Sequence, residues 1–248
     1  MTKYRKIALV MLAAPLALGV ASCGSSADND ALAGEPIDPI VAPAGTQWTE
    51  TVNISEMDGY VLGNPEAPIK LVEYGSLTCG ACASFATSAS EKLKSEYVSS
   101  GVVSYELRNQ VHNGIDLVLA SLVRCGQKES FHPLSDQVWF NLNDVLTRAQ
   151  ANPQALEEAM NLPENQRFVA VGEATGLLDF FAARGLSRDQ ASTCLADAAS
   201  VSAIADRSNT QSEELGVTGT PTFFINDRKV NANNWGDVEP LLQQAGAR

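Results

Sequence analysis

The sequence predicts an α/β fold, because segments with strand and helix patterns alternate along the 248-residue chain. Residues 69–74 form a short apolar run rich in strand formers, shortly after a Gly-Asn-Pro turn signal. Apolar side chains then recur at helical spacing between residues 82 and 97. Residues 102–107 predict a second strand, so the three segments together indicate a β-α-β unit.

The C-terminal part of the chain predicts two further strands and a closing helix. Residues 222–225 and 229–230 are strand-like and flank Asn226-Asp227, a pair that favours a hairpin turn. Residues 235–245 then carry apolar side chains at the spacing of an amphipathic helix. The predicted order is therefore β-α-β, a long middle region, and β-β-α.

The composition of the chain excludes several classes of protein. Its hydrophobic content of 45% is too high for a disordered chain. The 17 basic and 29 acidic residues give a net charge of −12, so we expect no nucleic-acid partner. The two histidines, His112 and His132, leave little room for a histidine-based metal site, and we expect both to be partly exposed near helix boundaries.

The N-terminus predicts export. The first six residues contain three basic side chains and no acid, and residues 7–20 are uncharged and mostly apolar. This pattern is typical of a secretory signal and is too short for a membrane span. Residues 20–23, Val-Ala-Ser-Cys, resemble a bacterial lipobox, which predicts a signal peptide over residues 1–22 and a lipid on Cys23. Ordinary cleavage near Ala21, leaving a free thiol, is the alternative.

The region after the predicted lipid site has the composition of a tether. Residues 24–47 contain several Gly, Pro, Ala and Ser residues and no regular apolar period. As a flexible chain they would span roughly 25–30 Å. We therefore expect residues 23–47 to be a flexible tether to a membrane, and the folded domain to begin near Trp48. The protein would face the periplasm or another extracytoplasmic space.

The remaining cysteines indicate two pairs. If Cys23 is lipidated, four cysteines remain in a compartment where disulfides persist. Cys79 and Cys82 form a C-x-x-C motif, which leaves Cys125 with Cys194 for a structural disulfide. The alternatives are a zinc site at the C-x-x-C and two buried free thiols at Cys125 and Cys194.

The position of the C-x-x-C motif indicates redox chemistry. Its first cysteine lies between the predicted strand and the predicted helix, so Cys79 is expected at a helix N-terminus, where a thiolate is favoured. Cys82 is expected one turn further along the helix, shielded from solvent. From there it could resolve a mixed disulfide formed at Cys79. An inert structural disulfide is the alternative.

Two motifs resemble the DsbA-like branch of the thioredoxin superfamily. One is the run from residue 63 to the C-x-x-C, and the other is residues 216–226, which resemble the cis-proline segment of that family. The resemblance implies a thioredoxin fold whose two halves, residues 48–111 and 208–248, are separated by an all-helical insertion. Residues 112–207 fit such an insertion, since Pro and Gly are sparse there and helix-like apolar patterns occur.

The resemblance also implies roles for three residues outside the C-x-x-C. Glu73 matches the buried acid of the family, so we expect a raised pKa and proton exchange with Cys82. Pro221 matches the cis-proline, and the backbone of Thr220 before it would pair with an extended substrate. A solvent-facing Glu73 and a trans Pro221 are the alternatives. Threonine before the proline occurs in isomerases as well as oxidants of the family.

The expected function is a lipid-anchored thiol:disulfide oxidoreductase of the cell envelope, acting as an oxidase. The expected partners are exported proteins with thiols or disulfides, and a membrane redox partner, which is either a quinone-linked oxidase or an electron-importing reductase. No cofactor is implied, because the cysteine pair carries the electrons, and we expect a monomer. A reductase or isomerase on the same fold, or a lipid-tethered holdase, is the alternative.

Overall fold

A six-stranded sheet forms the centre of the computed structural model, which describes residues 32–248. The expected signal peptide and Cys23 lie outside the described residues. The strand order is β1-β2-β4-β3-β5-β6, with β3 and β4 parallel and the other neighbouring pairs antiparallel. Within residues 32–248, no helix has the length and apolar character needed to cross a membrane. The strands are β1 (Val52–Ile54), β2 (Tyr60–Leu62), β3 (Ile69–Gly75), β4 (Val103–Asn109), β5 (Thr222–Ile225) and β6 (Arg228–Val230).

The predicted β-α-β unit is confirmed as β3, α1 (Gly80–Lys92) and β4. Phe85 of α1 packs against Phe223 of β5, with ring centroids 4.6 Å apart. The same ring contacts Trp235 of α10 (Trp235–Gln244), at a centroid distance of 6.3 Å. α1 and α10 therefore cover the same face of the sheet and enclose its main apolar core.

The predicted C-terminal hairpin is also confirmed. β5 and β6 pair antiparallel, and the connecting Asn226 and Asp227 have φ angles of 48° and 64°. Two successive positive φ angles are what a type I′ turn requires, and Asn and Asp tolerate them. The Asn226 side chain also accepts a hydrogen bond of 2.8 Å from the Lys70 backbone N–H, which fastens the turn to β3.

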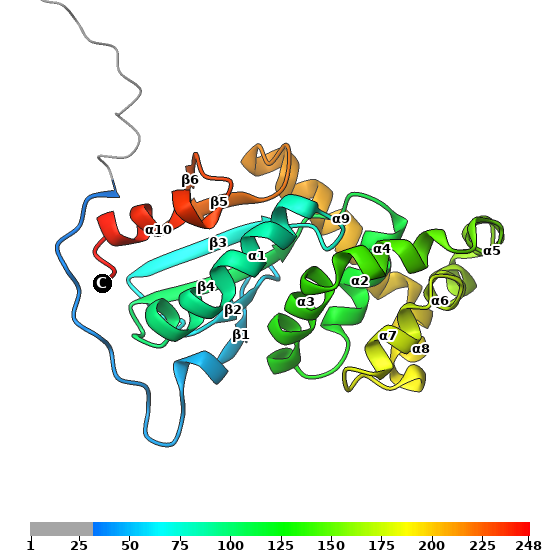
Figure 1. The fold of residues 1–248 in the computed structure, drawn as a ribbon, viewed down its shortest axis with the longest axis horizontal. Helices are drawn as coiled ribbons and strands as arrows, with labels where there is room; N and C mark the ends of the chain where they lie inside the picture. The colour runs from blue at the N-terminus through cyan, green and yellow to red at the C-terminus, as the bar shows by residue number, and fades with distance from the viewer. Residues whose placement is uncertain (1–31) are drawn as a thin grey trace, which may run out of the picture.

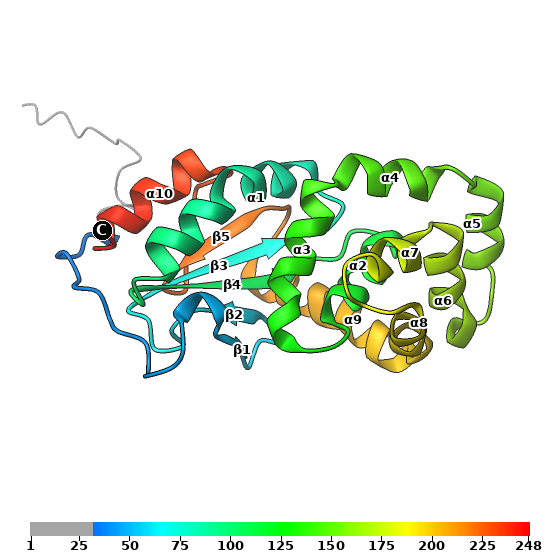
Figure 2. The same cartoon turned by 60° about the horizontal axis from the view of Figure 1, so that its bottom comes forward.

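The middle region is helical, which confirms the predicted all-helical insertion. Both views place its helices at one end of the molecule, beyond the ends at which β3 and β4 finish (Figures 1 and 2). Its last helix continues beyond the predicted boundary at residue 207 and ends at Gly216. Gly216 has a φ of 63°, and a glycine in this left-handed conformation commonly terminates a helix. The helices are α2 (Gly114–Arg124), α3 (Phe131–Phe140), α4 (Leu142–Gln150), α5 (Pro153–Met160), α6 (Glu164–Ala174), α7 (Leu177–Ala182), α8 (Arg188–Ala196) and α9 (Ala198–Leu215).

Two strands at one edge of the sheet are not indicated by the sequence patterns. β1 and β2 have three residues each, which is too short for an alternating pattern to be recognised. β2 pairs with β4 and β1 pairs with β2, so both depend on a sheet that distant segments build. Their positions are therefore decided by tertiary pairing.

The structure corrects the expectation of a flexible tether over residues 23–47. From Leu32, which is buried, to residue 47 the chain lies against the domain as an N-terminal strap. Figure 1 shows this strap along the end of the domain opposite the insertion. Its backbone N–H groups donate hydrogen bonds of 2.8–3.0 Å to backbone carbonyls of the domain: Gly34 to Gln244, Ile37 to Gly246, and Ile40 to Ser100.

The strap approaches the domain too closely for side chains at two glycines. A Cβ on Gly34 would lie 2.5 Å from the carbonyl oxygen of Ala245, and one on Gly101 would lie 2.4 Å from that of Ile40. The prediction of flexibility rested on the types of side chain in this segment. The strap is instead held mainly by hydrogen bonds of its backbone, which the composition does not reveal. Residues 32–47 are therefore part of the folded unit.

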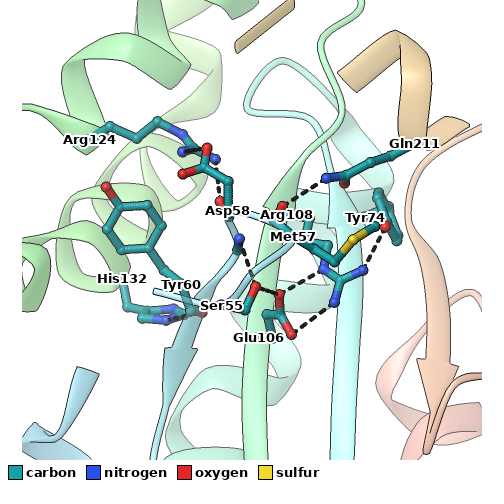
Figure 3. A network of polar contacts seen from close by, with 11 residues as sticks. Ser55, Met57, Asp58, Tyr60, Tyr74, Glu106, Arg108, Arg124, His132 and Gln211 are labelled. Atoms are coloured by element: carbon teal, nitrogen blue, oxygen red, sulfur yellow. Dashed lines mark hydrogen bonds and ion pairs between the residues drawn. The ribbon is translucent and has the colours of Figure 1, made fainter. Parts of the chain in front are cut away.

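A polar network fastens the loop between β1 and β2 to the insertion (Figure 3). Arg124 of α2 donates to the Asp58 carboxylate at 2.6 Å and to its backbone carbonyl at 3.1 Å, and Arg207 of α9 pairs with the same carboxylate. Gln211 of α9 donates to the Met57 carbonyl at 2.7 Å. Because these groups are directional and partly shielded from water, the network fixes the orientation of the insertion relative to the sheet.

The predicted Cys125–Cys194 disulfide is present in the insertion. It joins the residue after α2 to α8, with a Cα–Cα distance of 6.0 Å and a sequence separation of 69 residues. A disulfide that closes a loop of this length stabilises by roughly 4 kcal/mol on the chain-entropy model. The alternative of two free thiols is excluded, and the pair lies apart from the C-x-x-C.

The expectation of a partly exposed His132 is wrong, whereas His112 is exposed. His132 is buried on α3, and its Nε2 lies 2.9 Å from the Tyr60 backbone carbonyl (Figure 3). Burial lowers the pKa of His132 to about 3, so the ring is neutral and donates Nε2–H to that carbonyl. The helix faces the sheet at this position, so a backbone carbonyl of β2 supplies the partner.

We predict that a chain beginning at Trp48 is less stable than one beginning at Leu32 by about 2–4 kcal/mol. Each of the three lost backbone hydrogen bonds contributes about 1 kcal/mol and the buried Leu32 side chain about 1.5 kcal/mol, and the conformational entropy lost on ordering the strap offsets part of this sum. Urea unfolding of the two chains measures the difference. Equal midpoints would show that the strap is not part of the cooperative unit.

Candidate active site

Cys79 is the last residue of the loop that connects β3 to α1. It is the N-cap residue of α1, with an extended backbone (φ −88°, ψ 120°), and its sulfur accepts the Cys82 backbone N–H at 3.2 Å. The open N–H groups and the dipole at a helix N-terminus favour negative charge at this position. The side chain is partly exposed, so another sulfur can reach it.

The surroundings lower the pKa of Cys79 to about 5. The largest cause is the hydrogen bond from the Cys82 side chain, and the backbone N–H groups of Cys82 and Ala81 act in the same direction. Partial burial of the sulfur opposes them. Gly80 and Ala81 contribute no side-chain donor, so Cys82 and the helix backbone stabilise the thiolate.

Cys82 differs from Cys79 in burial, although both are free thiols on the same helix. Its side chain is fully buried, and this burial raises its pKa far above the ordinary value. The hydrogen bond to Cys79 and the nearby Glu73 carboxylate raise it further. At neutral pH the pair is therefore poised as one thiolate at the surface and one protonated thiol beneath it.

Glu73 lies in β3 beneath the cysteine pair and is completely buried. Its side chain shares the α1 face of the sheet with Leu71, two residues earlier, as the alternation of a strand requires. Burial raises the pKa of Glu73 to about 8, opposed by a hydrogen bond of 2.6 Å from the Tyr105 hydroxyl. The alternative of a solvent-facing Glu73 is excluded.

The segment containing Pro221 meets the cysteine pair from the other end of the chain. The Thr220–Pro221 peptide bond is cis, and the Thr220 carbonyl oxygen lies 3.3 Å from the Cys79 sulfur, close enough to accept a hydrogen bond from it when the thiol is protonated. The Thr220 backbone therefore lies beside the reactive sulfur, where an extended peptide could pair with it. The trans alternative for Pro221 is excluded.

Asp116 supports the loop before Cys79, and the sequence analysis did not identify it. It lies in the first turn of α2, is buried, and accepts hydrogen bonds from the Ser76 hydroxyl (2.7 Å) and the Leu77 backbone N–H (2.9 Å). Acidic residues are common in the first turn of helices, so the sequence carries no distinguishing signal. The contact connects the insertion directly to the active-site loop.

Two hollows flank the reactive cysteine, and α4 contributes to both. One has a volume of about 710 Å³ and the other of about 420 Å³. The larger hollow is lined by Gly80, the residue after Cys79, and in part by Ala83, Trp139, Phe140 and Leu142. The smaller hollow is lined by Thr78, the residue before Cys79, and in part by Ile115, Leu146, Leu156 and Met160.

The described residues contain no group of three or more His, Cys, Asp or Glu side chains that could hold a metal ion. The structure brings together five of the predicted residues at this site: Cys79, Cys82, Glu73, Thr220 and Pro221. Cys125 and Cys194 are bonded to each other elsewhere in the insertion. The arrangement can support attack by or on an exposed sulfur, with a buried thiol and a buried carboxyl beneath it to exchange a proton.

Comparison with known proteins agrees with this geometry. A family model described as thioredoxin matches residues 55–244. A Rickettsia bellii protein named as a protein-disulfide oxidoreductase is 25% identical over 196 residues, which cover 79% of this chain and 67% of that protein. The chain spans about half to two thirds of the length of three further Rickettsia relatives.

Solved structures show the same fold. A protein-disulfide isomerase from Novosphingobium aromaticivorans superposes with a TM-score of 0.70 at 26% identity, covering 76% of this chain and 97% of that one. The alpha-DsbA1 of Wolbachia pipientis superposes with a TM-score of 0.58 at 22% identity, covering 88% of this chain and 96% of that one. The chain belongs to the thioredoxin family. The proteins and structures to which it is similar include those named as a disulfide oxidoreductase, a disulfide isomerase and a DsbA.

We predict that the Cys79 thiolate forms with a midpoint near pH 5. Cys82→Ala removes the largest cause of the shift, so the midpoint should rise towards that of a free cysteine, about 8.5. Cys82→Ser keeps a hydrogen-bond donor and should shift it less. The ultraviolet absorbance of the thiolate, followed against pH, measures all three midpoints. An unchanged midpoint in Cys82→Ala would contradict this assignment.

Proposed function

We propose that this protein exchanges disulfides with exported proteins and acts as an oxidase. The observation that carries the proposal is the partly exposed Cys79, whose pKa is about 5, directly above the buried Cys82. A stabilised thiolate favours the reduced pair, so the oxidised pair passes its disulfide on readily. The cysteines carry the electrons themselves, and the mechanism requires no cofactor.

The proposed reaction begins when a substrate thiolate attacks the Cys79 sulfur of the oxidised pair. The Cys79–Cys82 bond breaks, and Cys82 leaves with the electron pair and takes a proton from Glu73. A second substrate thiolate then attacks the substrate sulfur of the mixed disulfide. The substrate disulfide forms, and Cys79 leaves as a stabilised thiolate. The Thr220 backbone would hold the substrate segment during both steps.

The reduced pair must then be reoxidised by a membrane partner. For an oxidase this partner is a quinone-linked membrane oxidase, and for a reductase the pair would instead receive electrons from an electron-importing membrane reductase. A Bacillus subtilis relative, 20% identical over 74% of this chain, is named disulfide bond formation protein D, which favours oxidation. The isomerase name of the Novosphingobium structure favours the alternative of an isomerase.

The reduction potential of the pair distinguishes an oxidant or isomerase from a reductant. We predict a value between about −120 and −180 mV for a chain beginning at Leu32, which is the range of oxidants and isomerases. Equilibration against glutathione buffers measures it, and a Cys125→Ser/Cys194→Ser variant controls for the second disulfide. A value near about −250 mV or below would make the protein a reductant and would overturn the oxidase proposal.

Refolding of a reduced, scrambled substrate tests the holdase alternative with the same chain. Cys79→Ser should lose the ability to restore disulfides, because it removes the attacked sulfur. If the variant retained full oxidase activity, the role of Cys79 would be wrong. If it suppressed aggregation as well as the unaltered protein without forming disulfides, the holdase alternative would be favoured.

We further propose that the protein is held at a membrane of the cell envelope by a lipid on Cys23. The proposal is supported by the basic N-terminus, the apolar run and the lipobox-like Val-Ala-Ser-Cys at residues 20–23. Several acyl chains on one cysteine would give stable anchoring, whereas a single chain is marginal.

Detergent-phase partitioning of the full chain expressed in bacteria tests the anchor. We predict that the unaltered chain enters the detergent phase and that Cys23→Ser remains in the aqueous phase. Cys79→Ser is the matched control, because it replaces another cysteine without touching the predicted lipid site. A Cys23→Ser chain that still enters the detergent phase would contradict the lipid anchor.

A further inference from the structure

The two oxygens of the Glu73 carboxyl have different surroundings. Oε2 accepts the Tyr105 hydroxyl at 2.6 Å, while Oε1 is buried and has no hydrogen-bond partner. Tyr105 is buried on β4, where its neighbour across the parallel pair is Leu71, two residues before Glu73 on the same face. The hydroxyl therefore reaches the carboxyl diagonally across the sheet.

The neighbours of this carboxyl add negative charge or none. Cys79 and Cys82 approach from α1, and the Cys79 thiolate raises the pKa of Glu73. Asp136 of α3 acts in the same direction, although its carboxylate is paired with Lys94. From the same helix, the ring of His132 lies 5.3 Å from that of Tyr105, but burial keeps the imidazole neutral.

The unpartnered oxygen lies over the end of β3. A Cβ on Gly75 would stand 3.0 Å from Oε1 and 3.3 Å from the Trp139 ring, so glycine leaves space there. Opposing the effect of burial, the Tyr105 hydrogen bond favours the charged carboxylate. An oriented anion with one free oxygen is the arrangement needed to accept a proton from a neighbouring thiol.

We propose that Tyr105 is a positioning residue for proton exchange between Glu73 and Cys82. Its hydroxyl holds Oε2, which orients the carboxyl and leaves Oε1 for the Cys82 proton. The inference rests on the proposed function, since it concerns the thiol-exchange step at the same site.

The proton exchange takes place when the reduced protein reacts with a disulfide. After Cys79 has formed a mixed disulfide, the Cys82 proton moves to Glu73 Oε1, and the Cys82 sulfur attacks Cys79. The Cys79–Cys82 bond forms, and the bond from Cys79 to the substrate sulfur breaks. The electron pair leaves on the substrate as a thiolate. In the oxidase direction the same proton returns from Glu73 to Cys82.

A chromogenic aromatic disulfide separates the two chemical steps in stopped flow. Attack by Cys79 releases the first aromatic thiolate, and attack by Cys82 on the mixed disulfide releases the second. In the unaltered protein the rate of the second phase should rise with pH around a midpoint at or below about 8. The midpoint can lie below that value because Cys79 carries no charge in the mixed disulfide.

Tyr105→Phe should raise the midpoint of the second phase by about one pH unit, because it removes a hydrogen bond to the anion. At a pH below both midpoints the second phase should then be about ten-fold slower, since about ten-fold less carboxylate is available. The first phase, which depends on Cys79, should stay within about two-fold. Glu73→Gln should remove the pH step, and Tyr105→Phe should add nothing further in that background.

Tyr97→Phe is the matched control, since the Tyr97 hydroxyl donates to Glu239 at 2.7 Å in another part of the molecule. It should leave the pH midpoints of both phases unchanged. An unshifted second phase in Tyr105→Phe, or an equal slowing in the Glu73→Gln background, would overturn the role of Tyr105. A missing first phase in the unaltered protein would instead overturn the proposed function.

If Tyr105→Phe is less stable, the Glu73 midpoint can be measured directly. Carbon-13 labelling of glutamate side chains and NMR titration at a temperature where both proteins are folded give this midpoint. The Glu73 pKa should be higher in Tyr105→Phe than in the unaltered protein. Equal values would overturn the proposal independently of any kinetic effect.

Discussion

The difference in depth between two sulfurs on one helix is the constraint on which the rest of this site depends. Cys79 precedes the first turn of α1 and Cys82 lies within it, so helical geometry places one sulfur at the rim and the other in the core. Burial raises the pKa of Cys82, and the hydrogen bond between the two sulfurs lowers the pKa of Cys79 while raising that of Cys82 further. Glu73, also buried, adds a carboxyl whose pKa of about 8 lies close to physiological pH.

Holding this geometry requires segments from across the chain. The Thr220 backbone reaches Cys79 from 141 residues away, and Asp116 of the insertion holds the loop before it through Ser76 and Leu77. The insertion is in turn fastened to the sheet by the network around Asp58. The helical insertion therefore supports the reactive cysteine as well as shaping the surface beside it.

The local patterns predicted the main elements, and the resemblance predicted the burial of Glu73, which strand alternation places on the same face as Leu71. They failed where the backbone or a distant partner decides the outcome. The strap is held by backbone hydrogen bonds that composition does not register. His132 is polar but buried, because a carbonyl of β2 supplies its partner. β1 and β2 are too short to show a pattern of their own.

The sequence by itself determined the class of chemistry: a C-x-x-C between a strand and a helix, an acid six residues earlier, and a distant proline segment in the order typical of DsbA-like proteins. Tertiary structure alone decided the pKa values, the support from Asp116, and the Tyr105 contact to one oxygen of Glu73. The physical reason is that spacing along the chain encodes local geometry. Desolvation and hydrogen bonding at a site depend on which distant residues pack around it.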